Sequence, residues 1–175
     1  MRAPRRFVLP ACTLALAAGA VALGGGDPKA GDATAPGSQG GSLATVSLSS
    51  NLNGSREIDA TTGANRAGDL DGRGVGSVLL RGRRQICVNV SVANIAAPTA
   101  AHIHGAVAGQ NGAVVVTLGT PPQGGLAGAI ACSQIAAALH LDLRRRPHRY
   151  YINVHNALYP NGAIRGQLFR TPAGS

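Results

Sequence analysis

Three histidines stand at spacings that suit metal binding. His102 and His104 are separated by one residue, and His155 follows Asn153 at the same spacing in a second segment. In a β-strand, residues i and i+2 point to the same face, so each of these pairs projects together. Neutral imidazole is a good ligand for copper and for zinc. If the two segments pack as relatives, the three histidines form one candidate metal site.

A structural role for the same region competes with the metal hypothesis. His and Asn side chains near hairpin ends can hydrogen-bond to the backbone of the loops. They would then hold the connections at residues 105–112 and 156–162 without any metal. An acidic partner is expected for Arg165, because an inward-facing Arg is rarely tolerated unpaired. The predicted polar network consists of His102, Asn153, His155, Glu57 and Arg165.

Catalytic arrangements of other kinds are missing from the sequence. Glu57 is the only Glu, no Ser stands in a nucleophile-elbow motif, and no pair of carboxylates suits hydrolysis. The segment from Asp69 to Gly72 begins like a calcium-binding loop but lacks the remaining ligands, so it is interpreted as a polar turn. We therefore predict no catalytic residues and a protein that is not an enzyme.

Short β-strands are expected to position these residues. The 175-residue chain has 25 Gly and 10 Pro, with only 13% charged residues, which argues against a charged helical bundle. Residues 86–92 alternate between apolar and small or polar side chains, a period typical of a strand with one buried face. Further strands are expected around residues 43–48, 75–80, 114–116, 150–155 and 163–169. The last strand but one places Tyr150 and Tyr151 on opposite faces, one in the core and one on the surface.

One short helix is expected near residues 133–143. Ser133 is its predicted N-cap, residues 144–146 are three arginines that suit the negative C-terminal end, and Pro147 ends it. The predicted fold class is therefore all-β, an antiparallel β-sandwich or a barrel-like sheet with one short helix.

The two histidine segments belong to a longer internal repeat. Residues 102–104 are followed by Asn111-Gly112, and residues 153–155 by Asn161-Gly162. Both segments predict a strand, a connection through Asn-Gly and a returning strand. The Asn-Gly pairs are expected to supply the positive φ angles that tight connections require. The repeat predicts two related hairpins.

The N-terminus has the features of an export signal. Residues 1–6 are basic and residues 7–23 are apolar, which predicts a signal peptide at 1–23 with cleavage between residues 20 and 30. An uncleaved N-terminal anchor and lipidation at Cys12 remain alternatives. Residues 24–41 are predicted to form a flexible linker, and residues 42–171 the domain. We expect a secreted, monomeric protein with no membrane span after cleavage.

Export bears on the remaining cysteines. Cys12 is lost with the leader, which leaves Cys87 and Cys132 as an even pair in an oxidising compartment. We predict that they are bridged, with two free buried thiols as the alternative. A bridge between Cys87 and Cys132 would stabilise the fold by about 4 kcal/mol, because it restricts the conformational freedom of the unfolded chain.

The net positive charge of the sequence suggests an anionic partner. The formal net charge is +9, and a basic exported domain can bind anionic cell-surface polymers. Residues 144–149 hold four arginines and His148. A solvated helix end is the first interpretation of this cluster, and contact with anionic polysaccharide or phospholipid is the second. Nucleic acid is not expected as a partner outside the cell, and an unknown protein partner remains open.

Two blocks of the sequence are familiar. AAHIHGAVAGQNGAVVVTL (residues 100–118) and YYINVHNALYPNGAIRGQL (residues 150–168) resemble the signature blocks of the CHRD domain. This family was named from chordin and also occurs in secreted microbial proteins. The similarity extends to residues 86–95, to Glu57 and to the turn at 69–72, and so covers about residues 43–170. The positions of Cys87 and Cys132 also resemble a cysteine pair found in many microbial members.

The resemblance implies a β-sandwich-like domain. For function it implies only that chordin, which gave the family its name, binds growth factors. The sequence therefore predicts a secreted, non-enzymatic binding or structural module at or outside the cell surface, without a cofactor. The alternative is a copper- or zinc-binding protein, with redox activity as a further option, centred on the three histidines.

Overall fold

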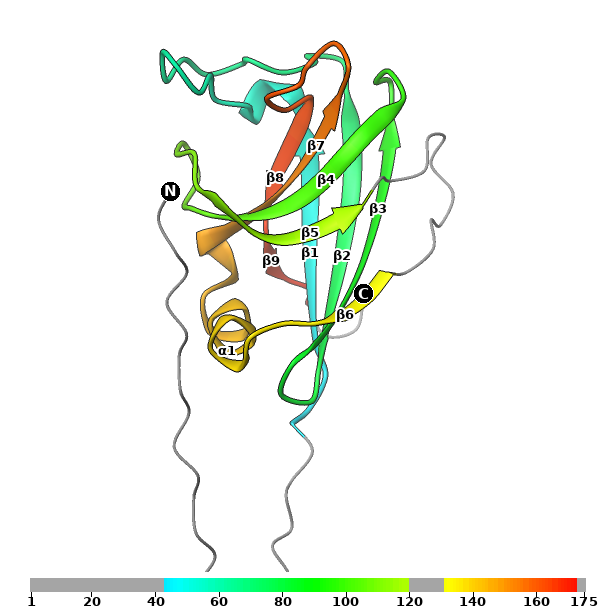
Figure 1. The fold of residues 1–175 in the computed structure, drawn as a ribbon, viewed down its shortest axis with the longest axis vertical. Coiled ribbons are helices and arrows are strands. Elements are labelled where there is room, and N and C mark those ends of the chain that lie inside the picture. The colour runs from blue at the N-terminus through cyan, green and yellow to red at the C-terminus, as the bar shows by residue number, and fades with distance from the viewer. Residues whose placement is uncertain (1–42, 120–130, 173–175) are drawn as a thin grey trace, which may run out of the picture. The chain divides into compact units, whose positions relative to one another are not determined.

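The computed structural model describes residues 43–119 and 131–172, so the predicted signal peptide and the linker lie outside the described residues. The strands form one antiparallel sheet that curls on itself (Figure 1). The elements in chain order are β1 (Val46–Asn53), η1 (Gly54–Arg56), β2 (Arg73–Arg81), β3 (Gln85–Ala93), β4 (Pro98–Gly105), β5 (Ala113–Gly119), β6 (Ala131–Gln134), α1 (Ala137–Arg145), η2 (Pro147–Arg149), β7 (Tyr150–Asn156), β8 (Ile164–Gln167) and β9 (Phe169–Arg170).

The sheet has the strand order β5-β4-β7-β8-β1-β2-β3-β6, and β9 pairs with β1. Curling brings strands that are not neighbours into contact. A Cβ atom added to Gly76 of β2 would lie 2.4 Å from Cδ1 of Ile152 in β7. The all-β prediction is confirmed, and the single curled sheet corresponds to its barrel-like form.

Alternating side chains explain which side of the sheet is buried. In β3 the residues Ile86, Val88, Val90 and Val92 all belong to the hydrophobic core, as the alternating pattern predicted. β7 differs because both of its faces are covered. Tyr150 lies in the core, and Tyr151 on the other face is only 2% exposed. The prediction of a surface tyrosine is therefore wrong, because loops cover the outer face of this strand.

The ends of several strands differ from the sequence prediction. β1 begins at Val46 and continues to Asn53, beyond residue 48, where the expected strand ends. The small side chain of Ser50 lies fully buried between Leu48 and Leu52, so a polar residue does not interrupt the strand. The strand expected over residues 163–169 is divided at Leu168, which is buried while β8 and β9 lie on either side of it.

The disulfide between Cys87 and Cys132 is confirmed. The two cysteines are direct partners in the pairing of β3 with β6. This pairing also corrects the predicted helix start, because Ser133 belongs to β6 and does not cap α1. The N-cap position is Ala136, which provides no side-chain hydrogen bond, and α1 begins at Ala137. No helix in the described ranges has the length and apolar character needed to cross a membrane.

Candidate functional site

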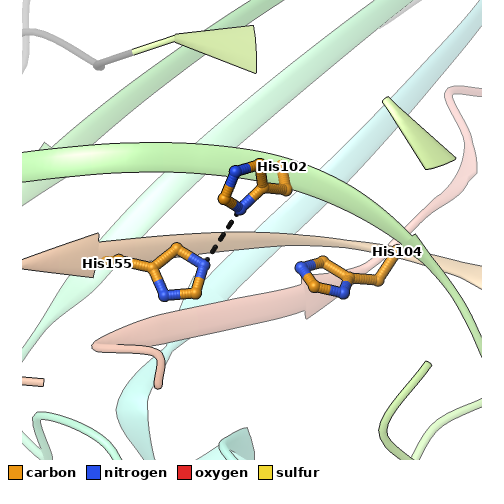
Figure 2. A group of neighbouring side chains, drawn as sticks. All are labelled: His102, His104 and His155. Atoms are coloured by element: carbon orange, nitrogen blue, oxygen red, sulfur yellow. Dashed lines mark hydrogen bonds between the residues drawn. The ribbon is translucent and has the colours of Figure 1, made fainter. Parts of the chain in front are cut away.

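The three histidines lie on the outer face of two neighbouring strands. Ile103 of β4 and Ile152 of β7 are opposite each other and point into the core. The residues on either side of each of them therefore point outward. His102 and His104 project from β4, and His155 projects from β7 beside them (Figure 2).

The histidine cluster, comprising His102, His104 and His155, is close enough to share one ion. One ligand nitrogen from each ring lies within 4.8 Å of the others. Nδ1 of His102 is 3.1 Å from Nε2 of His155, which is a hydrogen bond (Figure 2). Ligand nitrogens around a tetrahedral zinc ion lie roughly 3.4 Å apart, given bonds of about 2 Å. Small side-chain movements would therefore bring the three nitrogens onto one ion.

Backbone carbonyls determine which nitrogen carries the proton in two of the rings. His104 Nδ1 lies 2.8 Å from the carbonyl oxygen of Gly112, and His155 Nδ1 lies 3.0 Å from that of Pro160. A carbonyl oxygen only accepts, so both Nδ1 atoms donate and each neutral ring keeps its lone pair on Nε2. Nε2 of His104 is buried and has no hydrogen-bond partner among the described residues. Histidines that bind metals commonly have this arrangement of second-nitrogen hydrogen bonds.

The same two hydrogen bonds attach the histidines to their connecting loops. His104 holds the connection at residues 105–112, and His155 holds the one at 156–162. The network interpretation assigned this role to His102, Asn153 and His155. His102 instead bonds to His155, and the Oδ1 atom of Asn153 is buried without a partner among the described residues.

Burial keeps part of the cluster in the neutral form. Desolvation lowers the pKa of His104, which is 9% exposed, and His155 and Arg165 lower it further. Desolvation also lowers the pKa of His102, followed by the effects of the two neighbouring imidazoles. A neutral imidazole is the form that binds a metal, so these shifts favour binding at neutral pH.

Tyr151 connects the histidine cluster to Arg165. Its ring stacks on that of His104 at a centroid distance of 4.9 Å, and the guanidinium carbon of Arg165 lies 4.7 Å from the centroid. Its hydroxyl accepts a hydrogen bond from the N–H of Gly112 at 3.3 Å. Tyr151 was not among the site residues predicted from the sequence. The signal was present, because Tyr151 shares the two-residue spacing of Asn153 and His155.

Arg165 and Glu57 form a buried pair beside this cluster. Nε of Arg165 lies 3.9 Å from Oε2 of Glu57 and donates to the carbonyl of Arg56 at 2.5 Å. NH1 of Arg165 donates to Oδ1 of Asn111 at 2.8 Å. Glu57 is 2% exposed, and desolvation raises its pKa to about 8, although the charge of Arg165 opposes that shift. The pair therefore joins β8 to η1 and to the loop that His104 holds.

Comparison with known protein families matches residues 48–168 to the CHRD domain. The chain belongs to the CHRD domain family. The matched range of the CHRD domain includes both histidine hairpins, the Glu57–Arg165 pair and both cysteines of the disulfide. No curated protein and no solved structure matches the chain.

Proposed function

We propose that this CHRD domain is a secreted, non-enzymatic binding module whose histidine cluster holds one copper or zinc ion. The observation that supports this proposal most directly is the convergence of three ligand nitrogens within 4.8 Å on one face of the sheet. Imidazole ligands suit both metals, so the donor set alone does not select between them.

The polar-network and metal hypotheses describe two states of one cluster. The Nδ1 atoms of His104 and His155 hold the loops in either state, and each Nε2 atom carries the lone pair that would bind an ion. Since Nε2 of His155 accepts, His102 Nδ1 donates the proton of the hydrogen bond that joins them. For an ion to lie between the two rings, His102 would take its other neutral tautomer, with the proton on Nε2 and the lone pair of Nδ1 free. Metal binding therefore requires loss of one hydrogen bond and leaves the loop contacts intact.

The three histidines of the cluster differ in how far they are exposed to solvent. His104 is buried, whereas His102 and His155 are each half-buried, so an ion can reach the cluster from solvent. The orphaned Nε2 of His104 gives a further reason to expect a ligand, because buried polar atoms are seldom left without a partner. A metal ion at this position would satisfy that atom.

Secretion and the absence of catalysis are part of the same proposal. The disulfide between Cys87 and Cys132 is typical of oxidising compartments, which supports export. The only Glu of the sequence, Glu57, is buried against Gly162, where an added Cβ would lie 2.7 Å from its carboxyl carbon. This position is unsuited to a general base that must reach a substrate.

Metal analysis of protein purified without a histidine tag tests the proposal. After stripping with chelator and dialysis against copper or zinc, the wild-type chain is expected to retain one ion and to melt at a higher temperature. His104→Gln and His155→Gln are expected to lose the bound ion. His148→Gln is the matched control, because His148 is exposed and lies outside the cluster.

Two results would contradict the metal proposal. One is wild-type protein that holds no stoichiometric copper or zinc and melts at the same temperature with and without chelator. The other is metal retention by His104→Gln and His155→Gln at the wild-type level. Melting the metal-free variants separates the two roles, because loss of the loop contacts lowers the melting temperature without any metal present.

A further inference from the structure

α1 and the turn between β2 and β3 lie at one end of the sheet (Figure 1), and eight described arginines lie on or next to α1, this turn, η2 and β9. Hydrogen bonds connect these segments. Nε of Arg84 donates to the carbonyl of Ile135, NH1 of Arg144 donates to that of Leu80, and NH2 of Arg170 donates to that of Arg144. We name this surface the basic end, and it comprises Arg81, Arg83, Arg84, Arg144, Arg145, Arg146, Arg149 and Arg170.

Acidic residues are scarce near these arginines. Asp142 is the one acidic residue in this part of the described chain, and it forms an ion pair with Arg146. The other described acidic residues lie at the opposite end of β1 and β2, in the segment that joins those strands: Glu57, Asp59, Asp69 and Asp71. These carboxyl groups share their end with Arg56, Arg66 and Arg73, whereas one described acidic residue accompanies the eight arginines of the basic end. The excess of positive charge, and with it the positive potential, therefore lies at the basic end.

Capping of α1 accounts for only part of this charge. Arg144 and Arg145 lie in the last turn of the helix, where positive charge is favourable. The arginines of the β2–β3 turn and of β9 have no such role, and only the tertiary structure brings them to the helix end. The side chains of Arg83 and Arg145 are exposed and make no hydrogen bond or ion pair with another described residue. Their guanidinium groups are available to a partner.

We propose that the basic end binds a hydrated anionic polymer that carries carboxylate or phosphate groups along its length. A guanidinium group binds either anion through paired N–H donors. Arginines on several segments can engage successive groups of one polymer, and such multivalent contacts strengthen binding.

A membrane surface fits the basic end less well than a polymer does. Peripheral membrane binding usually combines positive charge with apolar side chains that enter the bilayer. The large exposed apolar side chains that the structure describes near the basic end are Leu141 of α1, Phe169 beside Arg170 in β9, and Leu43 next to Ala44, whose carbonyl Arg144 contacts. Eight arginines therefore outweigh three apolar side chains on this surface, which favours a hydrated polyanion over a bilayer.

Binding to immobilised polygalacturonate and to a polyglycerol phosphate tests the proposal, with neutral dextran as the blank. The test variant is Arg83→Glu/Arg145→Glu. The matched control is Arg66→Glu/Arg73→Glu, because both of those arginines are exposed and lie toward the opposite end, while the change in net charge is the same. Metal-free, full-length protein is used throughout, so the result does not depend on the histidine cluster.

The wild-type chain is expected to bind at least one of the two anionic polymers. Charge reversal at the basic end should weaken that binding by about tenfold or more, against less than about twofold for the control. Raising the salt concentration should weaken the binding, because exposed charges are screened. Equal weakening by both variants, or no binding to either polymer, would overturn the proposal. Binding to vesicles that contain anionic phospholipid, with none to the polymers, would also overturn it.

Discussion

The β4–β5 hairpin supplies two histidines to the outer face of the sheet, whereas the β7–β8 hairpin supplies one. The two hairpins share an Asn-Gly pair, but they use it differently. In the first, Gly112 presents its carbonyl to His104. In the second, the carbonyl that meets His155 comes from Pro160, two residues before Gly162. Equivalent sequence positions therefore do not have equivalent contacts.

The glycines of the two pairs also differ in backbone conformation. Gly162 has φ +140°, as expected for a connection that needs a left-handed residue. Gly112 has no positive φ, and Gly109 of the same connection has φ +80° in its place. The expectation that both Asn-Gly pairs supply positive φ angles is thus wrong for the first hairpin. Gly112 is instead required by close approach, because an added Cβ would lie 2.2 Å from the carbonyl oxygen of Gly105.

The largest expected effect comes from a side chain at this close approach. Gly112→Ala should lower the free energy of unfolding by more than about 4 kcal/mol, because the backbone at Gly105 or at residue 112 must move to make room for the added Cβ. Gly109→Ala should lower it by only about 1 kcal/mol, because positive φ is its sole difficulty and no other atom lies within 4 Å of the added Cβ. Denaturant unfolding of both variants measures the difference. Equal effects would show that close approach does not distinguish the two glycines.

The second prediction concerns Glu57, the acidic residue beneath Gly162 of the second hairpin. Its folded pKa of about 8 lies above the ordinary value of 4.5, so the folded state keeps a proton that the unfolded state loses. Stability contributed by the protonated carboxyl is complete below pH 4.5, decreases as the pH rises to about 8, and is then constant.

Glu57→Gln should remove this dependence on pH. The free energy of unfolding of the variant minus that of the wild type should rise by up to about 4 kcal/mol between pH 5 and pH 8 and then level off. Denaturant unfolding in metal-free buffer measures this difference, in which the histidine titrations shared by both proteins cancel. Arg165 is the charged group that faces Glu57 most closely. A difference that stays flat or falls with pH would mean that Arg165 keeps Glu57 ionised.

The smallest predicted effects on the free energy of unfolding concern Asn111 and Asn161, the asparagines of the two Asn-Gly pairs. Asn111 donates to the carbonyl of Ile58 at 3.2 Å and accepts from Arg165, so Asn111→Ala should lower the free energy of unfolding by about 2 kcal/mol. Asn161 is exposed and makes no hydrogen bond to another described residue. Asn161→Ala should therefore change the free energy of unfolding by less than about 0.5 kcal/mol. Similar values for the two variants would contradict the difference between the hairpins.

Local patterns were sufficient for much of the fold and for the direction of the histidines. Alternation in β3 predicted the buried face, because side chains of a strand alternate strictly between two sides. The one-residue gap between His102 and His104 predicted that both would project from one face. The repeat of this pattern suggested that His155 would lie near them, and the CHRD resemblance covered nearly the whole domain.

Contacts between distant segments were decided by the tertiary structure alone. No local pattern shows that Tyr151 is covered by loops, that Asn111 meets Arg165, or that the arginines of the β2–β3 turn and of β9 lie beside α1. Alternation along a strand depends on neighbouring residues, so sequence spacing reveals it. Loop packing, the pKa of Glu57 and the charge of the basic end depend on how the sheet curls, which brings together residues with no fixed spacing in the chain.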